Sequence, residues 1–185
     1  NKNTAYIKIN NSLGNHDLIA AFDKTLDSLF QHKNIIIDLT ETPAGGNTTV
    51  ARAIMGRFTD KILPYQVHEF DEKQYQTKRH WVEYVSSRKE TYKGNLYVLV
   101  GRWTGSMGEG MAIGFDGMKR AKIIGTQMAG LIGAISNFQL SETKISFQFP
   151  TERLYHLNGT PRENFLPEIL TQNIEQTIQK AKEIE

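Results

Sequence analysis

The sequence predicts an α/β fold with a mostly parallel central sheet flanked by helices. Strand-like and helix-like segments alternate along the chain, and most of the strand-like segments are separated by stretches long enough to form a helix. Parallel strands need such connections, because the chain must cross back over the sheet before it enters the next strand. Residues 35–39, Ile-Ile-Ile-Asp-Leu, form a short apolar run that is typical of a strand covered on both faces.

The first half of the chain gives the clearest periodicities. Ala5, Ile7 and Ile9 alternate with polar neighbours, which predicts a strand with one face on a core. Asp17 can cap the helix that follows, and Asn47 or Thr48 can cap another helix after the buried strand. The apolar stripe of the first helix comprises Leu18, Phe22, Leu26, Leu29 and Phe30, and that of the second comprises Val50, Ile54, Met55 and Phe58.

The second half begins with residues 68–93, which are polar and aromatic with weak periodicity. We interpret them as a surface excursion that contains at most short elements, a solvated insertion rather than a substrate lid. A strand at 96–100, a helix carrying Met111, Phe115 and Met118, and a strand at 121–124 then follow. A glycine-rich loop at 125–133 leads to an alternating strand at 144–149, and the chain closes on a helix at about 167–185. No repeat or boundary interrupts this order, so we expect a single domain over residues 1–185.

Composition excludes several classes of function. Lys and Arg number 22 and Asp and Glu number 20, so the net charge of +2 gives no basic stripe for nucleic acid. No apolar run approaches the roughly 20 residues that span a bilayer, so we expect no transmembrane segment. The absence of cysteine excludes disulfides and thiolate catalysis. The first residue is Asn, which favours a processed or truncated chain with an upstream domain in its parent.

The stretch "GRWTGSMGEGMAIGF", residues 101–115, places Ser106 between glycines where a strand hands over to a helix. Small residues around a serine let the backbone bend sharply and expose the hydroxyl beside the free amides of the helix. Serine is also a favoured N-cap, and the first glycine of the usual nucleophile motif is missing. Local sequence therefore leaves both a nucleophile and a simple cap open.

Gly45 and Gly46 follow the buried strand and can turn a backbone N–H toward a ligand, as an oxyanion hole requires, or can merely form a turn. Both glycine-rich steps fall at the carboxyl ends of predicted parallel strands, where ligands usually bind. No general base is evident, because residues 123–143 contain no lysine and the histidines all lie in polar, surface-like text. Glu163 can polarise a member of a catalytic triad or pair with Arg162. No histidine and carboxylate cluster has metal-ligand spacing, so we expect no metal and no cofactor.

Four segments, taken in order, resemble the catalytic domain of the C-terminal processing peptidases. These segments are "YIKINNS", "IIIDLTETPAGG", "LYVLVGRWTGSMGEGMAIGFDGMKRAKIIGT" and "PTERLYHLNGTPRENFLPEI". The family also includes the tricorn core protease and the non-proteolytic interphotoreceptor retinoid-binding protein. The resemblance implies a crotonase and Clp protease-like α/β spiral. It makes Ser106 the nucleophile, the amides of Gly45 or Gly46 and of Met107 the oxyanion donors, and Glu109 a structural residue.

Two departures from the family pattern matter. Processing peptidases place a lysine base in the loop where this chain has Gln127 to Gly133, so a Ser-Lys dyad is ruled out. The tricorn-like branch takes a histidine from a segment upstream of the first strand and supports it with a glutamate, which we match to Glu163. The resemblance therefore implies a serine peptidase lobe for peptide or protein substrates, with its base upstream of this chain and an extracytoplasmic location.

Two alternatives stay open. A catalytically silent peptide- or lipid-binding domain on the same scaffold would have no histidine in the upstream segment of its parent. A crotonase-like acyl-CoA enzyme would share the oxyanion chemistry without needing Ser106 as nucleophile.

Overall fold

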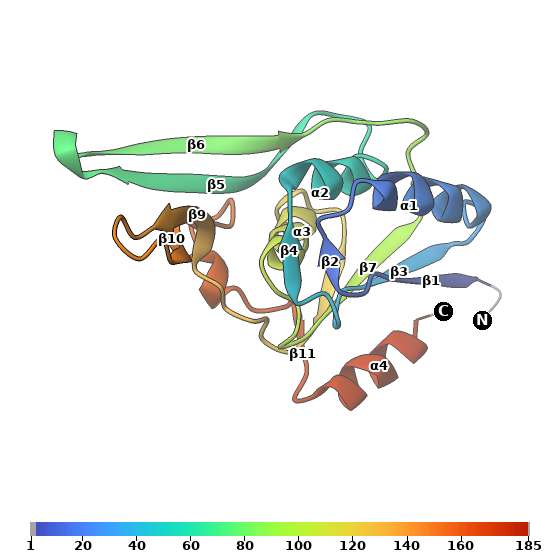
Figure 1. Ribbon diagram of the computed structural model, residues 1–185. Coiled ribbons are helices and arrows are strands. Elements are labelled where there is room, and N and C mark those ends of the chain that lie inside the picture. The colour runs from blue at the N-terminus through green and yellow to red at the C-terminus, as the bar shows by residue number, and fades with distance from the viewer. Residues whose placement is uncertain (1–2, 185) are drawn as a thin grey trace.

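A computed structural model describes residues 3–184 and shows a central five-stranded parallel sheet (Figure 1). Its strands lie in the order β1-β3-β7-β8-β11, with bounds Thr4–Lys8, Asn34–Asp38, Asn95–Val100, Lys122–Gly125 and Ile169–Leu170. Every residue of β3 is buried, as its apolar run predicts. All pairs in this sheet are parallel, so the carboxyl ends of its strands meet at one edge. The α/β prediction is confirmed.

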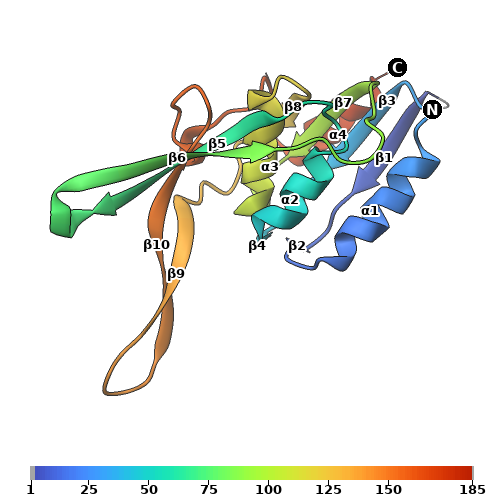
Figure 2. The same ribbon diagram turned by 90° about the horizontal axis from the view of Figure 1, so that it is seen from above.

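Helices cover both faces of this sheet (Figure 2). α1 (Asp17–Ser28), α2 (Thr48–Met55) and α3 (Met107–Gly117) pack on one face around the main core, which contains Phe22, Ile54 and Phe115. α4 (Ile174–Lys182) packs on the opposite face, where Ala181 meets a smaller cluster with Ile36 and Leu99. The main core lies between α1–α3 and the sheet, directly beneath the carboxyl edge that carries the candidate site.

Two helix starts differ from the sequence expectation. Asp17 is the first residue of α1 rather than its cap, and its amide donates to Asn15 Oδ1 at 2.9 Å. The final helix begins at Ile174 and not near Pro167, because β11 occupies Ile169–Leu170 and Asn173 caps α4 by accepting from Gln176 N. The cap of α2 is Asn47, whose side chain accepts from Val50 N, as predicted.

The largest correction concerns residues 68–93 and the loop after 125. Instead of short elements, β5 (Leu63–Glu72) and β6 (Thr77–Val85) form a long antiparallel hairpin around the 3-10 turn η1 (Lys73–Tyr75). β9 (Gly133–Gln139), which the sequence did not predict, pairs with β10 (Ser146–Tyr155). Together they make a four-stranded sheet in the order β6-β5-β10-β9, and both hairpins project from the α/β body (Figures 1 and 2).

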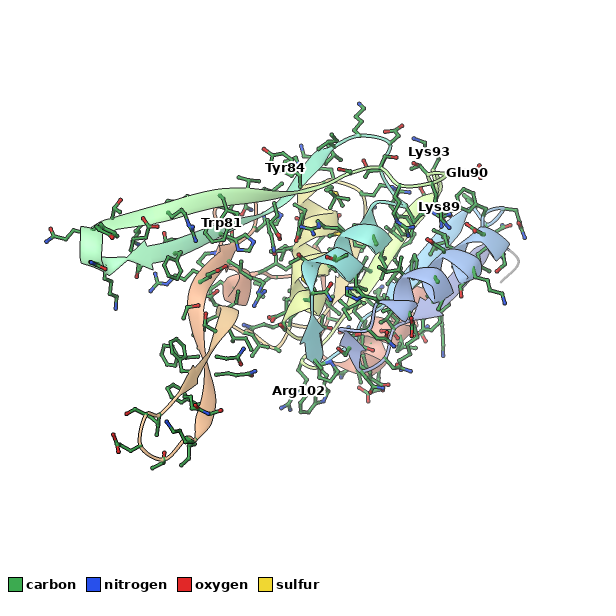
Figure 3. All side chains as sticks on the ribbon, turned by 45° about the horizontal axis from the view of Figure 1, so that its top comes forward. Trp81, Tyr84, Lys89, Glu90, Lys93 and Arg102 are labelled. Carbon is green, nitrogen blue, oxygen red and sulfur yellow. The ribbon has the colours of Figure 1, made fainter. Side chains whose placement is uncertain are left out.

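A cluster of charged side chains around the buried Asp23 fixes to α1 the end of the β5–β6 hairpin that joins the α/β body. Arg57, which follows α2, and Arg88, which follows β6, both donate to the Asp23 carboxylate, at distances of 2.6–2.8 Å. Lys89, labelled in Figure 3, adds a third cation 2.9 Å from Asp23 Oδ2. Although burial alone would raise the pKa of Asp23, these cations hold it well below its usual range. The hairpin is therefore anchored at its base by ionised side chains.

Candidate active site

Ser106 lies at the junction of β7 and α3, with a backbone conformation that is unusual for a non-glycine residue. It is the N-cap of α3, with φ +52° and ψ −113°. Strained conformations of this kind cost about 1–3 kcal/mol and persist only where the surrounding structure enforces them, often at functional sites. The local sequence left open a helix cap and a nucleophile on a sharp turn. In the structure Ser106 occupies the cap position and also lies on a sharp turn.

Bonds to the loop after β3 enforce this turn. Thr104 Oγ1 donates to the Leu39 carbonyl at 2.8 Å and accepts from Gly101 N at 2.9 Å. Gly105 N donates to the Thr42 carbonyl at 3.0 Å, and a Cβ on Gly105 would lie only 2.5 Å from the Pro43 carbonyl oxygen. Only glycine therefore fits immediately before the serine.

The short strand β4 (Ala44–Gly46) runs beside the Ser106 hydroxyl. A Cβ on Gly45 would lie 2.3 Å from Ser106 Oγ and 3.7 Å from Met107 N, so this backbone approaches both the hydroxyl and the first amide of α3. A Cβ on Gly46 would lie 2.2 Å from the Leu13 carbonyl, because β4 packs against β2 (Ser12–Leu13). Ser106, Met107 and Gly45, predicted separately from the sequence, are therefore brought together.

Glu109 organises the turn from below. It is fully buried, and its Oε2 accepts from Ser106 N at 2.7 Å. Its Oε1 accepts from the amides of Gly130 and Leu131, at 2.9 and 3.2 Å. Burial raises the pKa of Glu109, while the nearby Arg162 guanidinium, 3.9 Å away, and these amides oppose that rise. One carboxylate therefore connects the serine turn to the loop that leads into β9.

Arg162, which the sequence offered as a partner for Glu163, instead turns inward. Its Nη2 donates to the Leu131 carbonyl at 2.8 Å, and its side chain is buried beside Glu109. Glu163 lies next to it on the 3-10 turn η2 (Arg162–Asn164) and is half-buried. The charge of Glu163 still acts on Arg162 and opposes the fall in the Arg162 pKa that burial causes, but within residues 3–184 no hydrogen bond joins the Glu163 carboxylate to Ser106.

The sequence suggested that all the histidines are surface residues, but two of them are buried. His156 is 6% exposed, and its Nε2 lies 3.1 Å from Asp116 Oδ2 near the C-terminal end of α3, the end opposite Ser106. His16 is exposed, with Nε2 3.2 Å from Asn47 Nδ2.

His68 is also 6% exposed, within a polar cluster that sequence reasoning missed. Its Nδ1 lies 3.0 Å from Glu152 Oε2, its Nε2 lies 3.3 Å from Glu83 Oε2, and its ring stacks on Trp81. Burial lowers the pKa of His68, but the two carboxylates more than offset this and raise it. The available signal was the aromatic and β-branched content of residues 63–85, which favours strands that could carry such a cluster.

The parallel α/β sheet, with a strained serine at the start of α3 beside a glycine backbone, has the architecture of enzymes that act through a serine hydroxyl. Comparison with known families makes this assignment specific. The chain belongs to peptidase family S41, whose model matches residues 3–171. The family resemblance found in the sequence is confirmed.

Solved structures support the same fold. Mature CPAF complexed with lactacystin has a TM-score of 0.79 at 16% identity, over 95% of this chain and 48% of that chain. The photosystem II D1 C-terminal processing protease has a TM-score of 0.70 at 17% identity, over 90% and 42%. A lipoprotein from Streptococcus agalactiae has a TM-score of 0.67 at 19% identity, over 98% and 66%. The chain spans about half the length of the first two, and no curated protein matches its sequence.

Proposed function

We propose that this chain is the catalytic lobe of a serine endopeptidase in which the Ser106 hydroxyl attacks the scissile carbonyl. The observation that carries the proposal is the Ser106 conformation, φ +52° and ψ −113°, held beside the Gly45 backbone. Strain of this kind is retained where a side chain has to be presented in one orientation. Membership of a peptidase family gives the substrate class, a peptide or protein.

The oxyanion of the tetrahedral intermediate is stabilised by backbone amides in this mechanism. Met107 N lies at the positive end of α3, and the amide of Gly45 or Gly46 supplies the second donor from β4. Donors fixed before the reaction stabilise the developing charge without reorganising, and losing one costs about 10²–10³ in rate. Glu109 is a positioning residue, since it bonds the Ser106 amide and lies buried beneath the turn.

The general base comes from a segment of the parent protein outside these residues, in the manner of the tricorn-like branch. Two observations support this: His156 Nε2 lies 3.1 Å from Asp116 Oδ2 near the far end of α3, and His68 lies between two carboxylates on the hairpins. Glu163, which makes no bond within residues 3–184, orients that incoming histidine. The isolated 185-residue chain is then folded but nearly inactive.

Labelling of the full-length parent with a serine-directed fluorophosphonate tests the nucleophile. We expect a mass adduct on the peptide containing Ser106 and its loss in the Ser106→Ala variant, together with peptide hydrolysis. An adduct elsewhere, with Ser106→Ala still cleaving peptides, would overturn the assignment. Survival of thioester turnover in that variant would favour acyl-CoA chemistry instead.

A second candidate is a catalytically silent peptide- or lipid-binding domain. The observation that favours it is that His16 and His156 already face polar partners: His16 Nε2 lies 3.2 Å from Asn47 Nδ2, and His156 Nε2 lies 3.1 Å from Asp116 Oδ2. Reading the parent sequence upstream of Tyr6 distinguishes the two candidates, because the peptidase requires a histidine there. Without that histidine, binding is the better assignment.

We place the parent outside the cytoplasm, in the periplasm, the cell envelope or the medium. The support is the similarity to a protein described as a lipoprotein. Among residues 3–184, no helix is both long and apolar enough to cross a membrane. Fractionation of cells that express the parent checks this placement.

A further inference from the structure

The β9–β10 hairpin carries an exposed strip of large apolar side chains on one face. Strand register places Phe138 opposite Phe147, and their rings stack with centroids 5.5 Å apart. Leu140 and Ile145 continue the same face toward the tip, while Phe149 continues it toward the body, opposite Ser136. This apolar strip, formed by Phe138, Leu140, Ile145, Phe147 and Phe149, is 42–59% exposed at every position.

The strip borders an open sheet edge. β9 is the last strand in the order β6-β5-β10-β9, so in the described residues half of its backbone N–H and C=O groups face away from any partner strand. Natural edges are usually protected by lysine, proline or inward-pointing charge. Residues 133–139, Gly-Ala-Ile-Ser-Asn-Phe-Gln, contain neither proline nor any charge. This edge therefore suits an added, extended backbone.

The edge begins at the candidate active site. Leu131, two residues before β9, donates its amide to Glu109 Oε1, and the other oxygen of Glu109 accepts from Ser106 N. The side chains of Leu131 and Ile132 are 44% and 51% exposed, so apolar surface continues from the serine turn toward the strip. Ile132 and Phe149 also line a cavity of about 400 Å³ whose remaining lining is largely charged, including Glu69, Lys73 and Arg153, so the apolar contacts of a bound segment lie on the strip and not in this cavity.

The exposed area distinguishes two possible occupants. The five half-exposed side chains of the strip together expose an apolar area on the order of 500 Å². This contiguous area is larger than that of a single exposed apolar residue. A stable pair of proteins buries about 800 Å² on each partner, so a second copy of this chain would need further contacts. β9 is about 24 Å long at ~3.4 Å per residue, which matches a peptide of roughly seven residues.

From these observations we infer that the β9 edge and its apolar strip bind an extended, apolar segment of the substrate protein and lead it toward Ser106. The segment adds as a strand to β9, and its alternate side chains pack on the strip. The inference rests on the proposed peptidase function. It assigns the specificity of that function to alternating large apolar residues some distance from the scissile bond.

The test measures binding, so it does not depend on hydrolysis. The probe is a fluorescein-labelled nine-residue peptide of alternating leucine and threonine, titrated with the 185-residue chain and followed by anisotropy. The Phe138→Ser/Phe147→Ser double variant should weaken binding by about tenfold or more. The matched control, Asn137→Ser/Gln148→Ser, changes the opposite face of the same two strands and should stay within about twofold.

Two further probes examine the mode of binding. Two peptides are N-methylated, one at the even-numbered amides and one at the odd-numbered amides. One of the two should lose binding and the other should keep it, because only alternate amides bond to a neighbouring strand. Equal binding by the two double variants would overturn the inference. The inference would also be overturned if the chain failed to bind the peptide and instead formed a concentration-dependent dimer, measured by light scattering, or sedimented with phosphatidylcholine vesicles. Loss of Ser106 labelling with peptide binding intact would refute only the catalytic role.

Discussion

The strain at Ser106 leads to a quantitative prediction about stability. Alanine at this position keeps the Cβ and hence the unfavourable φ of +52°, whereas glycine adopts this conformation without steric cost. Strain of this kind is worth about 1–3 kcal/mol, and glycine loses about 0.5–1 kcal/mol more backbone entropy on folding than alanine. Ser106→Gly should therefore be more stable than Ser106→Ala by up to roughly 2.5 kcal/mol. Both variants lack the hydroxyl, so its own bonds cancel in the comparison.

Urea unfolding followed by circular dichroism measures this difference at constant m-value. Lys119, which lies just after α3 and outside the candidate site, also has a positive φ, +55°, and supplies the control. The free energy of unfolding of Lys119→Gly should also exceed that of Lys119→Ala. If the Lys119 pair shows the expected order while Ser106→Ala is more stable than Ser106→Gly, the serine turn is not strained in solution. The conformational argument for a nucleophile at Ser106 then fails.

Three other perturbations have definite outcomes. Gly45→Ala puts a methyl group 2.3 Å from Ser106 Oγ and should abolish fluorophosphonate labelling of the parent, whereas Gly101→Ala, whose new methyl meets nothing closer than 3.8 Å, should retain it. Glu109→Gln puts an amide donor where the carboxylate accepts from backbone amides, and should cost about 1–3 kcal/mol in urea unfolding, so an unchanged free energy of unfolding would contradict the structure. Burial would raise the pKa of Glu83, but hydrogen bonds from neighbouring side chains lower it to about 2. The folded pKa of Glu83 lies below its unfolded value of about 4.3, so the stabilisation from Glu83 is complete above that pH and is lost as the pH falls toward 2. Glu83→Gln should therefore flatten the acid side of a plot of the free energy of unfolding against pH.

The central sheet was predictable because its pattern is local. The continuous run at 35–37 and the alternation of Ala5, Ile7 and Ile9 each identify a strand from a few residues. β9 was not predictable, because Gly133, Ala134 and Asn137 have weak strand propensity, and the strand forms only through its pairing with β10. The weak periodicity of residues 68–93 has a related cause, since polar side chains such as His68 are buried in the second sheet.

The candidate site was predictable in part for the same reason. Ser106 and Gly45 each lie beside a recognisable strand end, and the parallel topology brings those ends to one edge. The pairing of Glu109 with Arg162 was not predictable, because no local pattern connects side chains so far apart in the sequence. Sequence proximity suggested Glu163 as the partner of Arg162, but packing turns the guanidinium inward toward the loop at Leu131.

The five-stranded and four-stranded sheets share no strand, and this separation has an evolutionary consequence. The amides that fix the serine turn through Glu109 belong to Gly130 and Leu131, upstream of β9. Insertions, deletions or exchanges within residues 134–149 can therefore accumulate without moving the Ser106 turn. If the β9 edge recognises substrate as proposed, selection can change which proteins are bound while the proposed chemistry stays constant, and chimaeras that exchange only this hairpin between relatives would change selectivity.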